Sequence, residues 1–190
     1  MADFEKAFEI TMGHEGAYSF DMDDAGGETY MGISRKYNPS WEGWKLIDTV
    51  SDKKMIQIEC PSVMNHVRSY YKKMYWDRFL GDSIDNQAIA NEMFDTAVNM
   101  GVARAAMFLQ KGLNYLNRNE STFKDLVVDG FVGEFTLRML FMLDIDDQEI
   151  LLKIMNVLQG QHYLEYMNKS PIQEKYCRGW FKRIEITKGA

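Results

Sequence analysis

A mainly α fold with one small loop or hairpin near the N-terminus is the architecture that this sequence predicts. Only 3 of its 190 residues are proline, a residue that interrupts helices. Several long segments place apolar residues three and four positions apart, which is the spacing of an amphipathic helix. Hydrophobic residues make up 46% of the chain, an ordinary share for a globular protein with a buried core.

The first helix is expected to begin at Asp3, whose carboxylate can cap it, and to end at Gly16. One face of this helix then carries Phe4, Phe8, Met12 and Glu15. Residues 17–33 are too irregular for long strands, and the Gly26-Gly27 pair suits a tight reversal. This segment is therefore predicted to be a loop or a small hairpin.

Helical periodicity continues through the rest of the chain. Helices are expected after Pro61 to about Trp76, over 86–100, over 102–116, within 127–143, over 146–168 and over 179–186. The polar segment 117–125 is the weakest point between them. We therefore expect a catalytic part over residues 1–120 and a smaller helical part over 121–190 packed against it.

Charge and cysteine content exclude several classes of protein. The net charge of −6 and the pI near 5.1 argue against nucleic-acid binding, which needs a basic face. Cys60 and Cys177 are far apart, and no Cys/His spacing is typical of zinc. No apolar run approaches 18 residues, so no membrane span is expected, and the start of the chain does not resemble a secretory signal. No cofactor or metal is predicted.

The segment 21–28 contains four acidic residues: Asp21, Asp23, Asp24 and Glu28. Its beginning resembles a calcium-binding loop, but Ala25 and Gly32 stand where such a loop needs an oxygen ligand and a bidentate glutamate. A polar loop whose aspartates close turns is a second interpretation. The third interpretation is an acid-catalysis cleft.

Catalysis by Glu15 is a hypothesis that rests on its expected place on the apolar face of the first helix and on its grouping with Asp24 and Thr29. Taken alone, Glu15 can equally be a surface glutamate near a helix end. Partial burial and the negative end of the helix both favour the protonated form, and so they raise the pKa of the Glu15 carboxyl. A protonated carboxyl can act as the general acid in glycoside hydrolysis. Asp24 can supply the second carboxylate on the far side of the sugar, and Thr29 can hold a water molecule there.

Several segments, in this order, resemble glycoside hydrolase family 108: HEGAY (14–18), DDAGGET (23–29), YMGIS (30–34), YWDRF (75–79) and FDTAVNMG (94–101). Members of this family are N-acetylmuramidases, also described as secretion activators, with a C-terminal peptidoglycan-binding region. The segments DGFVGEFT (129–136) and GWFKRI (179–184) resemble that region. Ala17 departs from the family pattern, which has glycine there.

The resemblance implies a lysozyme-like helical fold that hydrolyses peptidoglycan glycan strands at N-acetylmuramic acid. It implies Glu15 as the general acid, with Asp24 and Thr29 as the groups on the second side of the sugar. We also expect a monomer that is made in the cytoplasm without a classical signal peptide. Such a protein acts on the cell wall, in the periplasm or outside the cell, as an endolysin or as a secretion activator.

Three further residues are candidates for sugar binding. Tyr18 and Tyr30 flank the acidic loop and either stack on sugar faces or pack in the core. Asn99 either bonds an N-acetyl group or caps the C-terminal end of its helix before Gly101. Asp95 matches a family position, but a buried aspartate in a helix is expected to make a structural bond.

Two other functions remain open from the sequence. A lytic transglycosylase needs one glutamate, leaves an anhydro sugar and has no need of Asp24. A non-catalytic wall-binding or secretion-accessory protein keeps the fold and lacks turnover.

Overall fold

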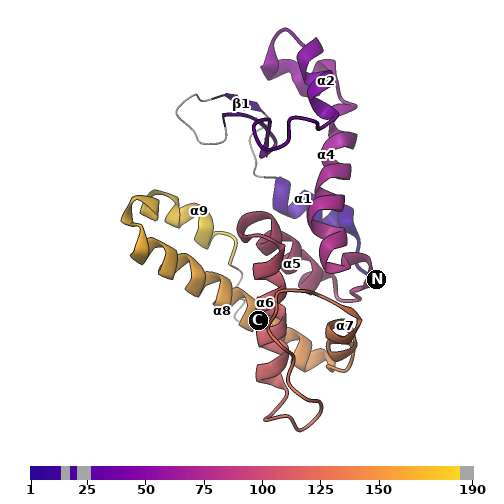
Figure 1. Cartoon of the computed structure of the whole chain (residues 1–190), viewed down its shortest axis with the longest axis vertical. Coiled ribbons are helices and arrows are strands. Elements are labelled where there is room, and N and C mark those ends of the chain that lie inside the picture. The colour runs from indigo at the N-terminus through magenta and orange to yellow at the C-terminus, as the bar shows by residue number, and fades with distance from the viewer. Residues whose placement is uncertain (14–17, 21–26, 185–190) are drawn as a thin grey trace. The chain divides into compact units, whose positions relative to one another are not determined.

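The structure is a computed structural model of the chain, and it describes residues 1–13, 18–20 and 27–184 (Figure 1). The chain divides into two compact units. The N-terminal unit comprises Phe8–Met74, and the helical unit comprises Met1–Ala7 together with Tyr75–Ala190. Most described residues lie in helices, so the prediction of a mainly α protein is confirmed.

Helix α1 (Phe4–Met12) begins directly after Asp3, as the sequence predicts. The Asp3 carboxylate accepts a hydrogen bond of 2.9 Å from the Glu5 N–H. This bond satisfies one of the amides that the start of a helix leaves unpaired. Phe8 and Met12 are buried, which confirms the predicted apolar face over the described helix.

A three-stranded antiparallel sheet lies in the N-terminal unit, with β1 (Tyr18–Phe20), β2 (Glu28–Tyr30) and β3 (Ile33–Ser34) in that order. The predicted small hairpin is thus confirmed over its described strands. Met31 and Gly32 make the turn between β2 and β3 with φ of 47° and 77°. The Tyr71 hydroxyl donates a 2.7 Å hydrogen bond to the Met31 carbonyl and so joins this turn to helix α4 (Val63–Tyr71).

Three short elements in this unit were not predicted: α2 (Gly43–Thr49), η1 (Lys53–Met55) and α3 (Ile56–Glu59). Helix α2 has 7 residues and buries only one side. A segment of this length is too short to show a clear apolar periodicity in the sequence. The helix predicted after Pro61 is present as α4. Helix α4 continues directly into a π-helical segment, η2 (Lys72–Trp76), whose last residue, Trp76, is fully buried.

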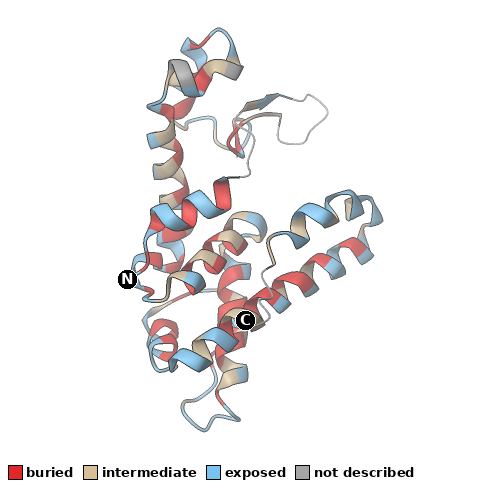
Figure 2. Ribbon diagram, turned by 180° about the vertical axis from the view of Figure 1, so that it is seen from behind, coloured by how far each residue is buried: buried red, intermediate tan, exposed pale blue. Residues whose placement is uncertain are grey.

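The helical unit contains α5 (Gln87–Met100), α6 (Val102–Leu116), α7 (Glu134–Phe141), α8 (Ile145–Lys169) and α9 (Cys177–Phe181), with the short turns η3 (Asp77–Phe79), η4 (Gly81–Ser83) and η5 (Pro171–Tyr176). Helices α5, α6 and α8 pack on one another. Figure 2 shows the buried side of α8, which carries Leu151, Met155, Gln159 and Tyr163 at helical spacing. A Cβ on Gly112 of α6 would stand 2.4 Å from the Leu151 Cδ1, so glycine permits this close crossing.

A mostly buried ion pair joins the segment after α9 to helix α5 in the helical unit. The Arg183 Nη1 lies 2.7 Å from the Asp95 Oδ1, and both side chains are mostly buried. The Gln159 amide of α8 donates to the other Asp95 oxygen at 3.0 Å. Trp180 of α9 stacks on Tyr163 of α8 with ring centroids 4.9 Å apart. The expected structural bond of Asp95 is therefore confirmed, and α9 starts two residues earlier than predicted.

The segment 129–136 forms a turn that is held against α6. The Asp129 carboxylate accepts from the Phe131 N–H and from the Gln110 amide, and the Gln110 carbonyl oxygen accepts from the Gly130 N–H. The hydrogen bond from Gln110 is the main cause that lowers the pKa of Asp129. Gly130 has φ of 78°, and Gly133 is the N-cap residue of α7. The predicted turn and helix start are confirmed.

Within the described part of the chain, no helix has the length and apolar character that crossing a membrane requires.

We expect Gly130→Ala to lower the stability of the helical unit by roughly 1–3 kcal/mol, because its backbone conformation is strained for any residue with a Cβ. The added Cβ would also stand 3.1 Å from the Ala103 carbonyl oxygen. Thermal unfolding followed by circular dichroism measures the change. Gly179→Ala is the control, because a Cβ there meets nothing within 4 Å. An equal effect of the two changes would contradict the assigned role of Gly130.

Candidate functional site

The sheet of the N-terminal unit carries three of the predicted site residues. Tyr18 lies opposite Tyr30, and Thr29 lies opposite Ser19. Because side chains alternate along a strand, Tyr18, Glu28 and Tyr30 share one face of the sheet and Thr29 belongs to the other. The strands therefore separate the predicted stacking residues from the predicted water-holding residue.

Tyr18 is held by an ionic network. Its hydroxyl donates a hydrogen bond of 3.1 Å to the Glu28 Oε1. The other Glu28 oxygen lies 2.8 Å from the Arg35 Nε. Burial, followed by the bond to Glu28, raises the pKa of the Tyr18 phenol. Glu28 is thus a carboxylate that is paired within the fold, and the Tyr18 ring is fixed at its hydroxyl end.

Arg35 extends this network to helix α2. Its guanidinium forms two bonds to the Asp48 carboxylate, of 2.6 and 3.2 Å, and lies 4.5 Å from the ring centroid of Trp44. The hydrogen bond from Arg35 is the main cause that lowers the pKa of Asp48. A planar guanidinium suits this combination of two carboxylates and one indole face. Sequence analysis missed Arg35, since its partners lie 7 and 13 residues away with no motif between them.

Thr29 is half-buried on β2. Its hydroxyl makes no hydrogen bond with another residue in the described ranges. As far as the described residues go, the hydroxyl is therefore open to a water molecule, as the predicted water-holding role requires. That role stays a prediction.

Tyr30 is fully buried in the N-terminal unit. Its hydroxyl contacts the Met64 sulfur at 3.8 Å, and its ring stacks on Trp41 with centroids 6.5 Å apart. Burial raises the pKa of the Tyr30 phenol. The ring offers no exposed face to a sugar in this state, so the packing interpretation fits Tyr30 and its contact supports Trp41.

Asn99 lies in the helical unit, in the last turn of α5, and its side chain is exposed. Its amide nitrogen donates to the Asp95 carbonyl oxygen at 2.8 Å. The amide thus bonds to the backbone near the helix end, and Gly101 follows with φ of 89°. This placement agrees with the interpretation of Asn99 as a residue of the helix terminus.

Glu15 and Asp24, the two predicted catalytic carboxylates, lie outside the described residues, as do Asp21 and Asp23 of the calcium alternative. Along the chain, Glu15 belongs to the link between α1 and β1, and Asp24 to the link between β1 and β2. Among residues 1–13, 18–20 and 27–184, no three Asp, Glu, His or Cys side chains gather as metal ligands would.

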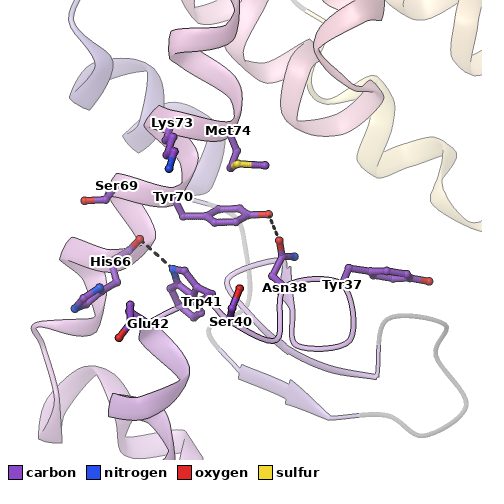
Figure 3. Close-up of a pocket in the computed structure, with 10 residues that line it drawn as sticks. All are labelled: Tyr37, Asn38, Ser40, Trp41, Glu42, His66, Ser69, Tyr70, Lys73 and Met74. Atoms are coloured by element: carbon purple, nitrogen blue, oxygen red, sulfur yellow. Dashed lines mark hydrogen bonds between the residues drawn. The ribbon is translucent and has the colours of Figure 1, made fainter.

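A groove of about 400 Å³ lies in the N-terminal unit, between the segment after β3 and helix α4 (Figure 3). Trp41 and Tyr70 line it with rings 6.3 Å apart at 69°. The Trp41 indole donates to the His66 carbonyl oxygen at 3.3 Å, and the Tyr70 hydroxyl donates to the Asn38 Oδ1 at 3.0 Å. Sequence analysis missed this groove, although the closely spaced Trp41 and Trp44 were a signal for it.

Comparison with known proteins matches both halves of the chain to families. Residues 8–101 match the family described as Glycosyl hydrolase 108, and residues 104–185 match the Predicted Peptidoglycan domain. The search of curated proteins gives no match. Among solved structures, Brucella abortus SagA aligns with a TM-score of 0.59 and 23% identity, over 95% of this chain and 88% of that chain.

The two matches define a glycoside hydrolase that acts on peptidoglycan. The chain belongs to the glycosyl hydrolase 108 family and carries a peptidoglycan domain after the hydrolase region. The likeness to SagA concerns the fold, and it confirms the predicted mainly α, lysozyme-like class with a small hairpin. The family resemblance of the sequence is confirmed as well.

We expect Arg35→Gln to lower the free energy of unfolding by about 1–3 kcal/mol, because it leaves the mostly buried Glu28 without its cation. Urea denaturation at neutral pH measures the loss. The deficit should shrink as the pH falls below about 4, since Asp48 has a lowered pKa and its pairing is lost only on protonation. Arg78→Gln is the control, because Arg78 is exposed and pairs with no carboxylate in the described residues. Equal losses from both changes would show that Arg35 has no special role.

Proposed function

We propose that this protein is an N-acetylmuramidase that cleaves peptidoglycan glycan strands by hydrolysis. The match of residues 8–101 to a glycosyl hydrolase family carries this proposal. Within the matched region, Glu15 follows the buried face of α1 and precedes the hairpin. Its carboxyl is the general acid that protonates the leaving oxygen of the scissile bond.

In the proposed mechanism a second group acts on the opposite side of the sugar ring. Asp24, in the link between β1 and β2, supplies the carboxylate that stabilises positive charge or activates water. Thr29 on β2 holds the water with its hydroxyl. The bond of Tyr18 to Glu28 fixes β1 against β2 on either side of the link that contains Asp24. The Asp24 segment therefore starts and ends on anchored strands.

The proposed roles divide near residue 120. Residues 1–120 supply hydrolysis, and residues 121–190 hold the protein on the wall. The two family matches support two such roles, but they meet at residues 101–104 and not near residue 120. The two parts differ in their proposed roles but do not pack separately, because α6, before residue 120, packs against α8, after it. The place of action is the cell wall, as an endolysin or as a secretion activator.

Glu15→Gln should leave the fold intact and reduce wall hydrolysis at least a hundredfold, because general acid catalysis contributes about that factor. Turbidity of a purified wall suspension measures the rate, and circular dichroism checks the fold. The matched control is Glu9→Gln, on the exposed side of α1. A folded Glu15→Gln protein that clears wall at half the native rate would remove Glu15 from the mechanism.

Asp24→Asn should cost roughly a hundredfold in rate while the fold is kept, because an amide cannot stabilise the developing positive charge as a carboxylate does. Asp23→Asn is the matched control on the neighbouring carboxylate and should change the rate less than threefold. If both variants keep the full rate, Asp24 is a turn residue and a mechanism with one carboxyl group, as in a transglycosylase, takes its place.

A further inference from the structure

The groove between the segment after β3 and helix α4 has no role in the mechanism proposed above. Its described lining residues all belong to the N-terminal unit, and Thr29, the predicted catalytic residue that the structure describes, is not one of them. Its floor and walls come from the segment 37–42 and from one side of α4 and η2 (Figure 3). Its volume of about 400 Å³ is within the range of small-ligand sites.

Two aromatic rings in the groove are fixed and only partly buried. Trp41 is held through its indole N–H and by stacking on the buried Tyr30, and Tyr70 is held through its hydroxyl by Asn38. Rings fixed in this way lose little conformational entropy when a ligand binds. Their faces suit the C–H groups on one side of a pyranose ring, which an aromatic π-system attracts.

Polar groups surround these rings. Ser40 and Ser69 are exposed and line the groove, and their hydroxyls can exchange hydrogen bonds with sugar hydroxyls or N-acetyl groups. The Asn38 side chain is already bonded to Tyr70 and to the Ser34 carbonyl, so it fixes the ring rather than the ligand. The lining thus combines apolar faces with small donors and acceptors, as carbohydrate requires.

The charges of the groove are distributed unevenly. Glu42 is neutralised by Lys45, with 2.6 Å between the two charged atoms. Lys73 is exposed and forms no ion pair with any residue in the described ranges, and Figure 3 shows its amine directed toward Tyr70. Among the described residues, no carboxylate therefore compensates the positive charge at this end of the groove, which favours a sugar with an acidic substituent.

We propose that this groove binds N-acetylhexosamine units of a glycan strand and that Lys73 selects a unit with an acidic substituent, as on muramic acid. A strand held there has one unit on Trp41 and Tyr70 while its acidic group faces the Lys73 ammonium. The inference rests on the proposed function, since peptidoglycan is what brings such a strand to the protein. Lys73 is a specificity-determining residue in this scheme and not a catalytic one.

The test is an NMR titration of the full-length protein, in which the tryptophan residues are labelled with ¹⁵N. Four indole N–H signals are expected, and the Trp41 signal is identified by its loss in Trp41→Phe. The ligands are chitotetraose, which is neutral, and the alternating glucosaminyl–muramyl tetrasaccharide with free lactyl carboxylates. Both should shift the Trp41 signal, and the acidic ligand should bind about two- to fivefold more tightly, as for a partly exposed ion pair.

Two pairs of variants locate the binding. Lys73→Gln should abolish the preference for the acidic ligand, whereas Lys6→Gln, an exposed lysine outside the groove, should keep it. Ser69→Trp should fill the groove and weaken both ligands on the order of tenfold. Asn65→Trp, one turn earlier on α4 and outside the lining, should leave their binding unchanged.

The outcomes separate this inference from the proposed hydrolysis. Mass spectrometry of the recovered ligand and a parallel wall digestion report turnover independently of the Trp41 signal. If the protein degrades wall while the Trp41 signal does not shift, the groove assignment is overturned and hydrolysis stands. The same holds if the Ser69→Trp variant binds the ligands as tightly as the unchanged protein does. A protein that binds both ligands at Trp41 without turnover supports the groove and counts against hydrolysis. A preference that survives Lys73→Gln overturns the role of Lys73.

Discussion

The guanidinium of Arg35 is the constraint on which the N-terminal unit depends. It faces the Glu28 carboxylate on β2, the Asp48 carboxylate on α2 and the Trp44 ring at the same time. Through Glu28 it also fixes Tyr18 on β1. A two-residue or three-residue strand has little stability of its own, so this sheet needs such anchors. Charged contacts, and not the length of the strands, therefore stabilise β1 and β2 on both sides of the link that contains Asp24.

Aromatic contacts extend from this network to the groove. Trp44 packs edge to face on Trp41 at 5.1 Å, and Trp41 stacks on Tyr30 of β2. The same unit thus contains the predicted catalytic segment of the chain and a surface suited to carbohydrate. In our account the first breaks a glycosidic bond, and the second holds a neighbouring or separate stretch of the strand. The acidic pI fits this arrangement, since one lysine in the groove attracts an acidic sugar without an overall positive charge.

The parts of the fold that could be predicted from sequence are those with local causes. Helices α5 and α6 match their predicted limits within a residue, because Asn86 caps the first and Gly101 separates the two. Helix α2 was missed because seven residues give too short a pattern. The Arg35 network and the groove were missed because their members are up to 37 residues apart and only the folded chain brings them together. For Tyr30 the sequence left sugar stacking and core packing open, and only the structure shows that its side chain is fully buried.

Glycan hydrolysis with an attacking water is the central claim of this account. Digestion of purified peptidoglycan in H₂¹⁸O, followed by mass spectrometry of the fragments, tests it most directly. We predict fragments with a reducing muramic acid end that carries one ¹⁸O atom, because a water oxygen replaces the glycosidic oxygen at the anomeric carbon. Fragments that end in an anhydro sugar without ¹⁸O, or a wall that stays intact, would contradict it.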